Sequence, residues 1–313
     1  MRTIEVIKGG AFSTVQDMGR YGYQRYGVPV SGALDQFALR VGNLLVGNEE
    51  GDAGVETTFM GPTLKFHFSA TIAITGGDLS PVLDGQRIPG WTTVSVPEGS
   101  TLSFKGPKDG IRSYVCVRGG IDVPIVMGSR STFTRSQIGG FHGRALTTGD
   151  MVPVADPDSD TLQPAERSLA SQDIPRYNRH HTLHVTMGPQ DDAFTAAGID
   201  TFLASTFTVT PMFDRMGYRL DGPVIQHKKG ADIVSDGTSR GAVQVPGSGK
   251  PIVLLADCGT TGGYTKIATV ISTDLPKIAQ AQPEDTVAFR AVSLEEAHRA
   301  LGEQEAVIAS LRG

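Results

Sequence analysis

The chain has 313 residues, 19% of them charged, and a formal net charge of -5. An acidic chain offers no basic field to a phosphate backbone, so nucleic acid is not expected as a partner. The length suggests two domains of roughly 150 residues each, and no apolar run approaches the ~20 residues that cross a bilayer, so no membrane partner is expected either.

The N-terminal segment, MRTIEVIKGG, lacks an apolar signal core and a cleavage site, which predicts a soluble, cytoplasmic protein. A short strand is predicted over residues 3–7, and the polar loop STVQDMGRYGYQRYGVP follows it. In this loop Gln16, Asp17 and Arg20 form a candidate binding cluster, because arginine offers a forked donor to a carboxylate or phosphate and aspartate offers a base or acceptor. An Asp17–Arg20 pair that stabilises its own turn is the alternative, and the sequence leaves both open.

A core-facing helix is predicted between residues 31 and 48, where Phe37, Val41, Leu44 and Leu45 recur at helical spacing. Short strands follow, separated by turns at intervals typical of a barrel or sandwich. They are predicted at residues 63–68, 71–75, 92–96, 101–105 and 113–117. The first half is therefore predicted to be mostly β.

Residues 155–176 are rich in Asp, Ser and Pro and show no period, which predicts a linker between a domain at residues 1–154 and another at residues 177–313. In the second domain, strands are predicted at residues 182–187 and 207–210. A helix over residues 293–311 begins with a Ser293–Glu296 capping box and is expected to pack on the second domain.

Three histidines, His180, His181 and His184, stand at the entry to the strand at residues 182–187. Zinc needs three or four convergent ligands, and no cysteine or acidic partner stands at a suitable spacing. No metal site is predicted, and the imidazoles are expected to be exposed.

The stretch at residues 251–271, PIVLLADCGTTGGYTKIATVI, is the candidate active site. Two apolar runs, residues 252–255 and 267–271, are typical of buried strands. Between them stand Asp257, Thr260, Thr261, Gly262, Gly263 and Tyr264. Polar groups held by two rigid strands are positioned at low entropic cost. An ordinary hairpin, in which Gly262 and Gly263 supply positive φ, is the alternative.

The two cysteines, Cys116 and Cys258, do not form a disulfide framework. Cys258 lies in the candidate site, but an unassisted thiol is mostly protonated at neutral pH, so a small packing residue is favoured over a nucleophile. Cys116 alternates within YVCVRG and is predicted to be a core residue.

Several blocks of sequence, in one order, resemble the C subunit family of bacterial ATP-dependent 5-oxoprolinase, also described as allophanate hydrolase subunit 2 or the biotin-dependent carboxyltransferase family. The blocks are TVQDMGRYG (residues 14–22), GVPVSGALD (27–35), NLLVGN (43–48), RGGIDVPIVMGSRST (118–132), GGFHGRAL (139–146), DRMGYRL (214–220), GAVQVPGSGKPIVLLAD (241–257) and TTGGYTKIATVI (260–271).

The resemblance implies a mostly β fold with minor α, made of two tandem cyclophilin-like β-barrel domains. It implies a hydrolase that opens the lactam of 5-oxo-L-proline to L-glutamate at the expense of ATP. The chain would act only in a hetero-oligomer with a paralogous B-type subunit, and in the oxoprolinase system a third, A-type protein would join them. No cofactor would be bound by this chain, and the complex would use ATP.

Carried onto this sequence, the family's polar positions are Gln16, Asp17, Arg20, Arg215, Gln244, Asp257, Thr260, Thr261 and Tyr264. Arg20 and Arg215 would clamp the substrate carboxylate, Asp17 or Asp257 would act as a base, and the backbone at residues 260–263 would stabilise a developing oxyanion. The resulting catalytic candidates are Asp17, Asp257 and Tyr264. Residues from both halves are expected to line one cleft.

Two departures from the family loop D-x-Q-T-T-G-G-Y-P stand out, because Gly259 replaces the glutamine and Thr265 replaces the proline. A lost amide hydrogen bond in a buried site costs ~1–3 kcal/mol, which leaves the substrate open.

Two other functions remain open. One is a carboxyltransferase subunit of a biotin-dependent urea or amide carboxylase, in which carboxybiotin on a separate carrier delivers CO₂, since this chain has no biotin-attachment sequence. The other is a non-enzymatic regulatory module of the kinase-inhibitor antagonist type.

Overall fold

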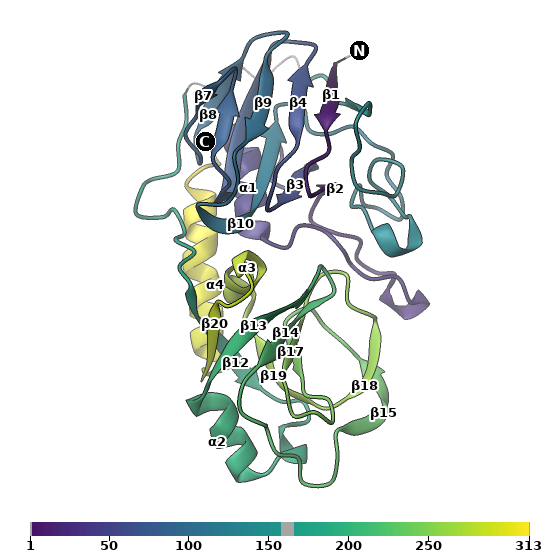
Figure 1. The fold of residues 1–313 in the computed structure, drawn as a ribbon, viewed down its shortest axis with the longest axis vertical. Coiled ribbons are helices and arrows are strands. Elements are labelled where there is room, and N and C mark those ends of the chain that lie inside the picture. Colours follow the sequence, from purple (N-terminus) through teal and green to yellow (C-terminus); the bar gives the residue numbers. More distant parts are fainter. Residues whose placement is uncertain (1, 158–165, 313) are drawn as a thin grey trace. The chain divides into compact units, whose positions relative to one another are not determined.

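The computed structural model describes residues 2–157 and 166–312, which form two compact units (Figure 1). The first unit comprises residues 2–21, 31–157, 166–176 and 307–312, and the second comprises residues 22–30 and 177–306. The middle of the predicted linker, residues 158–165, lies outside the described residues. Of its remainder, Leu169 is buried in the first unit and donates its backbone N–H to Trp91 O at 2.9 Å. No helix in the described ranges has the length and apolarity needed to span a membrane.

The first unit contains two sheets. A six-stranded sheet has the order β11-β1-β4-β9-β6-β7, that is Met151–Pro153, Thr3–Lys8, Thr63–Phe66, Thr101–Phe104, Pro81–Leu83 and Gln86–Arg87. A five-stranded sheet has the order β2-β3-β10-β5-β8, that is Phe12–Gln16, Gly54–Thr58, Asp109–Val117, Ala70–Asp78 and Thr93–Val96. Apolar side chains from both sheets form one core, which includes Val6, Phe66, Ile72 and Val115. We expected a barrel here, but within the described residues no ladder joins the edge strands of the two sheets to close one.

Helix α1, Gln36–Leu45, packs on β5 and β10 (Figure 1). Asp35 caps it by accepting a hydrogen bond from Ala38 N at 3.0 Å, which satisfies one of the free N–H groups of the first turn. The predicted helix began too early, because Ser31 has a positive φ of 57°, which a right-handed helix does not allow. Short 3₁₀ helices complete the first half at Gln24–Tyr26 (η1) and Thr134–Ser136 (η2).

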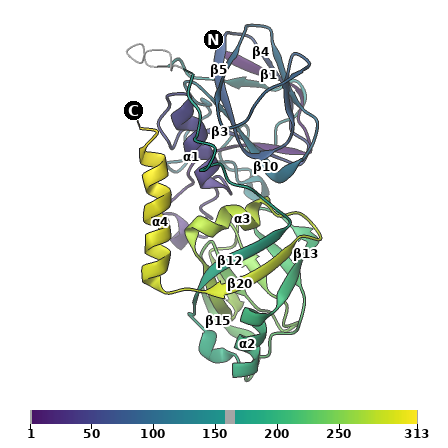
Figure 2. The same cartoon turned by 90° about the vertical axis from the view of Figure 1, so that its left-hand side faces the viewer.

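The second unit is built on a closed barrel, as predicted for this half. Its order is β12-β19-β16-β17-β14-β13-β20, that is His180–Met187, Lys266–Val270, Ala242–Gln244, Ile252–Leu254, Gly217–Asp221, Thr206–Phe213 and Thr286–Ala291. Strands β12 and β20 run parallel and close the ring. Helix α2, Ala196–Ala204, packs on β20 and helix α3, Leu275–Gln280, packs on β12 (Figure 2). Further 3₁₀ helices lie at Asp191–Ala193 (η3) and Ser272–Asp274 (η4).

A separate two-stranded sheet belongs to the second unit. It pairs β15, Asp232–Gly237, with β18, Thr261–Tyr264. Most side chains of β15 are exposed, and Val234 is 93% exposed. We call this pair the β15–β18 ribbon.

The last helix, α4, spans Leu294–Ala309 and begins with the predicted capping box. Ser293 Oγ accepts from Glu296 N at 3.1 Å, and Glu296 Oε2 accepts from Ser293 N at 2.8 Å. We expected the helix to pack on the second domain, and residues 294–306 do belong to the second unit, whereas the end of the helix from residue 307 belongs to the first. Ile308, in the last turn of α4, and Leu311, just beyond its end, are buried there in the core that also holds Leu45 and Trp91.

Candidate functional site

Asp17 follows β2 in the first unit and organises the loop at residues 129–131. Its Oδ1 accepts hydrogen bonds from Ser129 Oγ at 2.7 Å, from Gly19 N at 2.8 Å and from Ser131 Oγ. Its Oδ2 accepts from Arg130 N at 2.6 Å. The carboxylate therefore joins two segments 112 to 114 residues apart, and a role in catalysis would have to operate from within this network.

Arg20 and Gln16 are fully buried in the same region. Arg20 Nε donates to Val126 O at 3.1 Å and its Nη2 to Ser131 O at 2.7 Å, so the guanidinium binds backbone carbonyls. Gln16 Nε2 donates to Thr132 O at 3.1 Å and to Thr14 Oγ1 at 2.9 Å. Asp17 and Arg20 both hold the segment at residues 126–132, and the pairing of the two side chains with one another stays a prediction.

In the second unit, Arg215 and Asp257 form a buried ion pair. Arg215 Nε donates to Asp257 Oδ2 at 2.9 Å and Nη2 to Oδ1 at 3.2 Å, while the two side chains are 7% and 5% exposed. Asp257 N also donates to Arg215 O at 2.9 Å. The structure thus brings together two predicted site residues that lie 42 residues apart in the sequence. Each side chain provides the opposite charge that the other needs in a buried position.

The stretch around residues 251–271 is not a simple hairpin. Its two predicted strands, β17 and β19, both pair with β16, which lies between them in the barrel. The intervening residues 261–264 leave the barrel as β18 of the β15–β18 ribbon. Gly262 and Gly263 have extended strand geometry, so the positive φ expected of a tight turn is absent at both.

The ribbon exposes several predicted site groups. Thr261 and Tyr264 are exposed, with Tyr264 at 41%, while Thr260 is half-buried and its carbonyl accepts from Thr238 N at 3.0 Å. Thr265, which replaces the family proline, donates its N–H to Ala231 O at 2.9 Å. A proline has no such N–H, so this substitution adds a backbone bond at the end of the ribbon.

Gln244 lies at the end of β16, 7% exposed, opposite Lys266 in the β16–β19 ladder. Its Nε2 has no hydrogen-bond partner among the described residues. The amide packs on Gly262, where a Cβ would come within 2.5 Å of Nε2.

Lys266 was missing from the predicted site. Its side chain is 3% exposed, and Nζ donates to Asp236 Oδ2 at 3.0 Å. Gln190 contacts both residues of this pair: its Oε1 accepts from the backbone N–H of Lys266 at 3.1 Å, and its Nε2 donates to Asp236 Oδ2 at 3.2 Å. The sequence signal was a lysine at the head of the apolar run KIATV, where a buried strand seldom carries a charge.

The cysteines are buried, and two of the histidines, His181 and His184, lie beside carboxylates. Both cysteines are buried, and burial raises the pKa of Cys258, which disfavours a thiolate nucleophile. His181 is not exposed as expected, because it lies 3.3 Å from Asp285 Oδ2 at 5% exposure, and burial lowers its pKa. His184 Nδ1 lies 2.7 Å from Asp274 Oδ2. The described residues contain no cluster suited to a metal ion.

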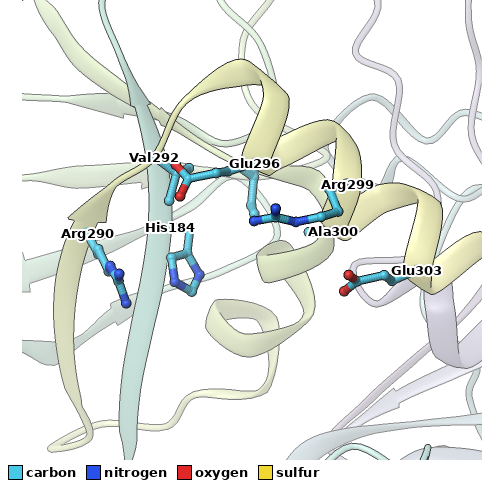
Figure 3. Close-up of a pocket in the computed structure, with 8 residues that line it drawn as sticks. His184, Arg290, Val292, Glu296, Arg299, Ala300 and Glu303 are labelled. Carbon is cyan, nitrogen blue, oxygen red and sulfur yellow. The ribbon is translucent and has the colours of Figure 1, made fainter.

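A pocket of about 320 Å³ opens beside α4 in the second unit (Figure 3). His184 from β12, Arg290 from β20, and Glu296, Arg299 and Glu303 from α4 line it. None of the predicted site residues lines this pocket.

Comparison with known proteins decides the family. The model of a family described as "Carboxyltransferase domain, subdomain A and B" matches residues 26–291. The chain is 37% identical to the C subunit of 5-oxoprolinase from Escherichia coli (strain K12), over 96% of this chain and 95% of that protein. This chain belongs to the 5-oxoprolinase C subunit family. The family member of Haemophilus influenzae is 35% identical, over 99% and 97% of the two chains.

The 5-oxoprolinase C subunit family is also related to part of larger enzymes. Urea amidolyase of Saccharomyces cerevisiae is 34% identical over 99% of this chain, which covers 18% of that protein. Among solved structures, the Kluyveromyces lactis urea carboxylase matches with a TM-score of 0.93 and 32% identity, over 99% of this chain and 29% of that one. The fold described above is therefore that of the carboxyltransferase region.

Proposed function

We propose that this chain is the C subunit of an ATP-dependent complex that opens the lactam of 5-oxo-L-proline to L-glutamate. The observation that carries the proposal is the coverage of the similarity, which extends over 95% and 97% of the two 5-oxoprolinase C subunits. The complex would contain a B-type paralogue of this chain and an A-type protein, and the ATP would be used by the complex.

Opening a lactam places negative charge on the amide oxygen, so the site must offer donors to that oxygen and a group that moves a proton. In this proposal the β15–β18 ribbon supplies the donors, with Tyr264 and the backbone at residues 260–263 facing the substrate. Arg215 and Asp257 hold the loop that leads into the ribbon, and Asp17 with Arg20 holds the loop at residues 126–132. The convergence of the Asp17 and Asp257 regions on one substrate stays a prediction, as does a cyclophilin-like origin for both units.

The test is reconstitution. The chain is co-expressed with its A-type and B-type partners, and L-glutamate release from 5-oxo-L-proline is measured with and without ATP. We expect ATP-dependent release by the complete complex and none by the isolated chain or by the complex that lacks it. A complete complex that turns over no 5-oxo-L-proline contradicts the substrate, and release by the isolated chain contradicts the subunit role.

A second candidate is carboxyl transfer to a urea-like nitrogen. The TM-score of 0.93 to the urea carboxylase structure favours it. Here a separate carrier would bring carboxybiotin as a substrate. Supplying a biotinylated carrier, its carboxylase, bicarbonate, ATP and urea to the same preparation separates the two functions, because only this candidate consumes bicarbonate.

A further inference from the structure

Lys266 carries a buried positive charge whose partner comes from outside the barrel. The ammonium is 3% exposed, whereas the side chain of Asp236, which binds it at 3.0 Å, is 55% exposed on the β15–β18 ribbon. A buried ammonium is costly unless it is paired. The carboxylate that pairs with this ammonium therefore comes from the β15–β18 ribbon and not from the barrel. A two-stranded ribbon with solvent-facing side chains is only marginally stable by itself.

A second donor stands beside this charge. Gln244 and Lys266 are opposite one another in the β16–β19 ladder, and cross-strand partners in antiparallel strands share one face with Cβ atoms about 5 Å apart. Gln244 is 7% exposed, and its Nε2 has no hydrogen-bond partner within the described part of the chain. A buried amide donor without a partner costs roughly 1–3 kcal/mol, so an acceptor that reaches it gains that energy.

Gly262 decides how closely the ribbon approaches this pair. A Cβ at this position would lie 2.5 Å from Gln244 Nε2 and 3.1 Å from Thr238 Cγ2. Glycine therefore lets the ribbon backbone lie directly against the amide. The ribbon covers the two donors, and Asp236 on it supplies the carboxylate.

We propose that Lys266 and Gln244 form a carboxylate-binding site at this end of the barrel, and that Asp236 occupies its Lys266 side until a small-molecule carboxylate takes its place and binds both donors. One carboxylate has two oxygens, which suits one ammonium and one amide N–H as separate donors. Gln190 bridges the two residues, because its Oε1 accepts from the backbone N–H of Lys266 and its Nε2 donates to the Asp236 carboxylate.

The electrostatics support an exchange rather than a fixed bond. The hydrogen bond from Lys266 lowers the pKa of Asp236, so Asp236 is ionised at neutral pH and the ammonium always faces a carboxylate. Because Asp236 is largely exposed, it regains full hydration when it leaves. A ligand carboxylate thus replaces one anion by another, and the buried charge is never left unpaired.

The test measures binding to the full chain, with three probes: acetate, 5-oxo-L-proline, and 2-pyrrolidinone, which has the lactam but no carboxylate. Calorimetric titration is expected to show binding of the two carboxylates and not of 2-pyrrolidinone. Lys266→Met should weaken carboxylate binding roughly tenfold or more, since hydrogen bonds to charged groups are the strong ones. Lys266→Arg keeps the charge and should retain part of the affinity.

Asp236→Asn separates exchange from a structural ion pair. If Asp236 competes with the ligand, removing its charge should raise carboxylate affinity several-fold, about the gain expected for an uncontested ammonium. Lys250→Met is the matched control, because Lys250 also pairs with an aspartate, Asp221, at 2.9 Å in the same unit, and it should change nothing. Circular dichroism checks that each variant is folded.

Three results would overturn the proposal: equal affinity in the parent chain and in folded Lys266→Met, weaker binding in Asp236→Asn, or no carboxylate binding by the parent chain. The inference rests on the proposed function only for the choice of 5-oxo-L-proline as a probe. Acetate binding tests the carboxylate site whatever the substrate of the complex is. A complex without lactam turnover therefore refutes the proposed function and does not bear on the carboxylate site.

Discussion

At the scale of single residues, the structure pairs two of the predicted charges with one another. Arg215 is predicted to bind a substrate carboxylate and Asp257 to act as a base, and both roles stay predictions. In the structure the two side chains form a bidentate ion pair and are nearly fully buried. A buried pair of this kind contributes little net stability, but removing one partner leaves an uncompensated charge.

Arg215→Met is therefore expected to destabilise the second unit by roughly 3–5 kcal/mol, and Asp257→Leu by a similar amount. The double variant, Arg215→Met with Asp257→Leu, should recover most of this loss, because neither charge remains. Urea unfolding of each protein, followed by circular dichroism, measures the differences.

The folded double variant also tests the predicted role in lactam opening. We expect the reconstituted complex that carries it to lose glutamate release, because the loop into the ribbon loses its anchor. Turnover that equals the parent value would show that Arg215 and Asp257 serve neither binding nor catalysis.

At the scale of elements, a glycine in helix α1 allows the helix backbone to lie close to the sheet. Helix α1 packs so tightly on β5 and β10 that a Cβ at Gly42 would lie 2.6 Å from Cys116 Sγ and 2.8 Å from Thr75 Oγ1. Both neighbours are buried, at 0% and 1% exposure, and cannot move into solvent. Helix propensity and packing therefore act in opposite directions at this position.

Gly42→Ala is expected to destabilise the first unit by about 1–3 kcal/mol, because overpacking outweighs the gain of ~1 kcal/mol that alanine brings to a helix. Gly302→Ala in α4 is the matched control. Among residues 2–157 and 166–312, no atom lies within 4 Å of a Cβ there, so the same change should stabilise by up to ~1 kcal/mol. Opposite signs in urea unfolding support the packing argument, and a stabilising Gly42→Ala would refute it.

At the scale of the whole molecule, the two ends of the sequence belong to one unit. Residues 307–312 join the first unit although residues 177–306 belong to the second. Ile308 and Leu311 are buried with Trp91 there, and Arg167 donates to Leu311 O. The core of the first unit is therefore complete only after residues 307–312 have been synthesised.

Ile308→Ala should destabilise the first unit by about 2–5 kcal/mol, the usual cost of truncating a fully buried aliphatic side chain. The chain has one tryptophan, and Trp91 lies in the same core, so its fluorescence during urea unfolding reports this unit. Leu301→Ala, on the same helix but 37% exposed, should change the midpoint by much less. Equal effects of the two variants would contradict the assignment of the chain end.

Much of the fold follows from local pattern. Strand-like segments between turn signals predicted β1, β4, β8, β9, β10 and β12 within a few residues, and two continuous apolar runs predicted β17 and β19. The Ser293–Glu296 capping box placed the start of α4. Helices α2 and α3 were not predicted, because the apolar residues of these short helices cover too few turns to show a helical period. The family blocks indicated the family that the comparisons confirm.

The sequence by itself therefore determined the mostly β class, and the family resemblance implied the second barrel. The sequence also nominated the polar residues of the candidate site, which stay predictions. Only the tertiary structure decided what those residues touch. It placed β16 between β17 and β19, paired Arg215 with Asp257, bound Asp17 to a loop more than a hundred residues away, and set Lys266 beside Gln244. Local periodicity reports which face of an element is buried, whereas the partner across that face is chosen by chain topology over long separations.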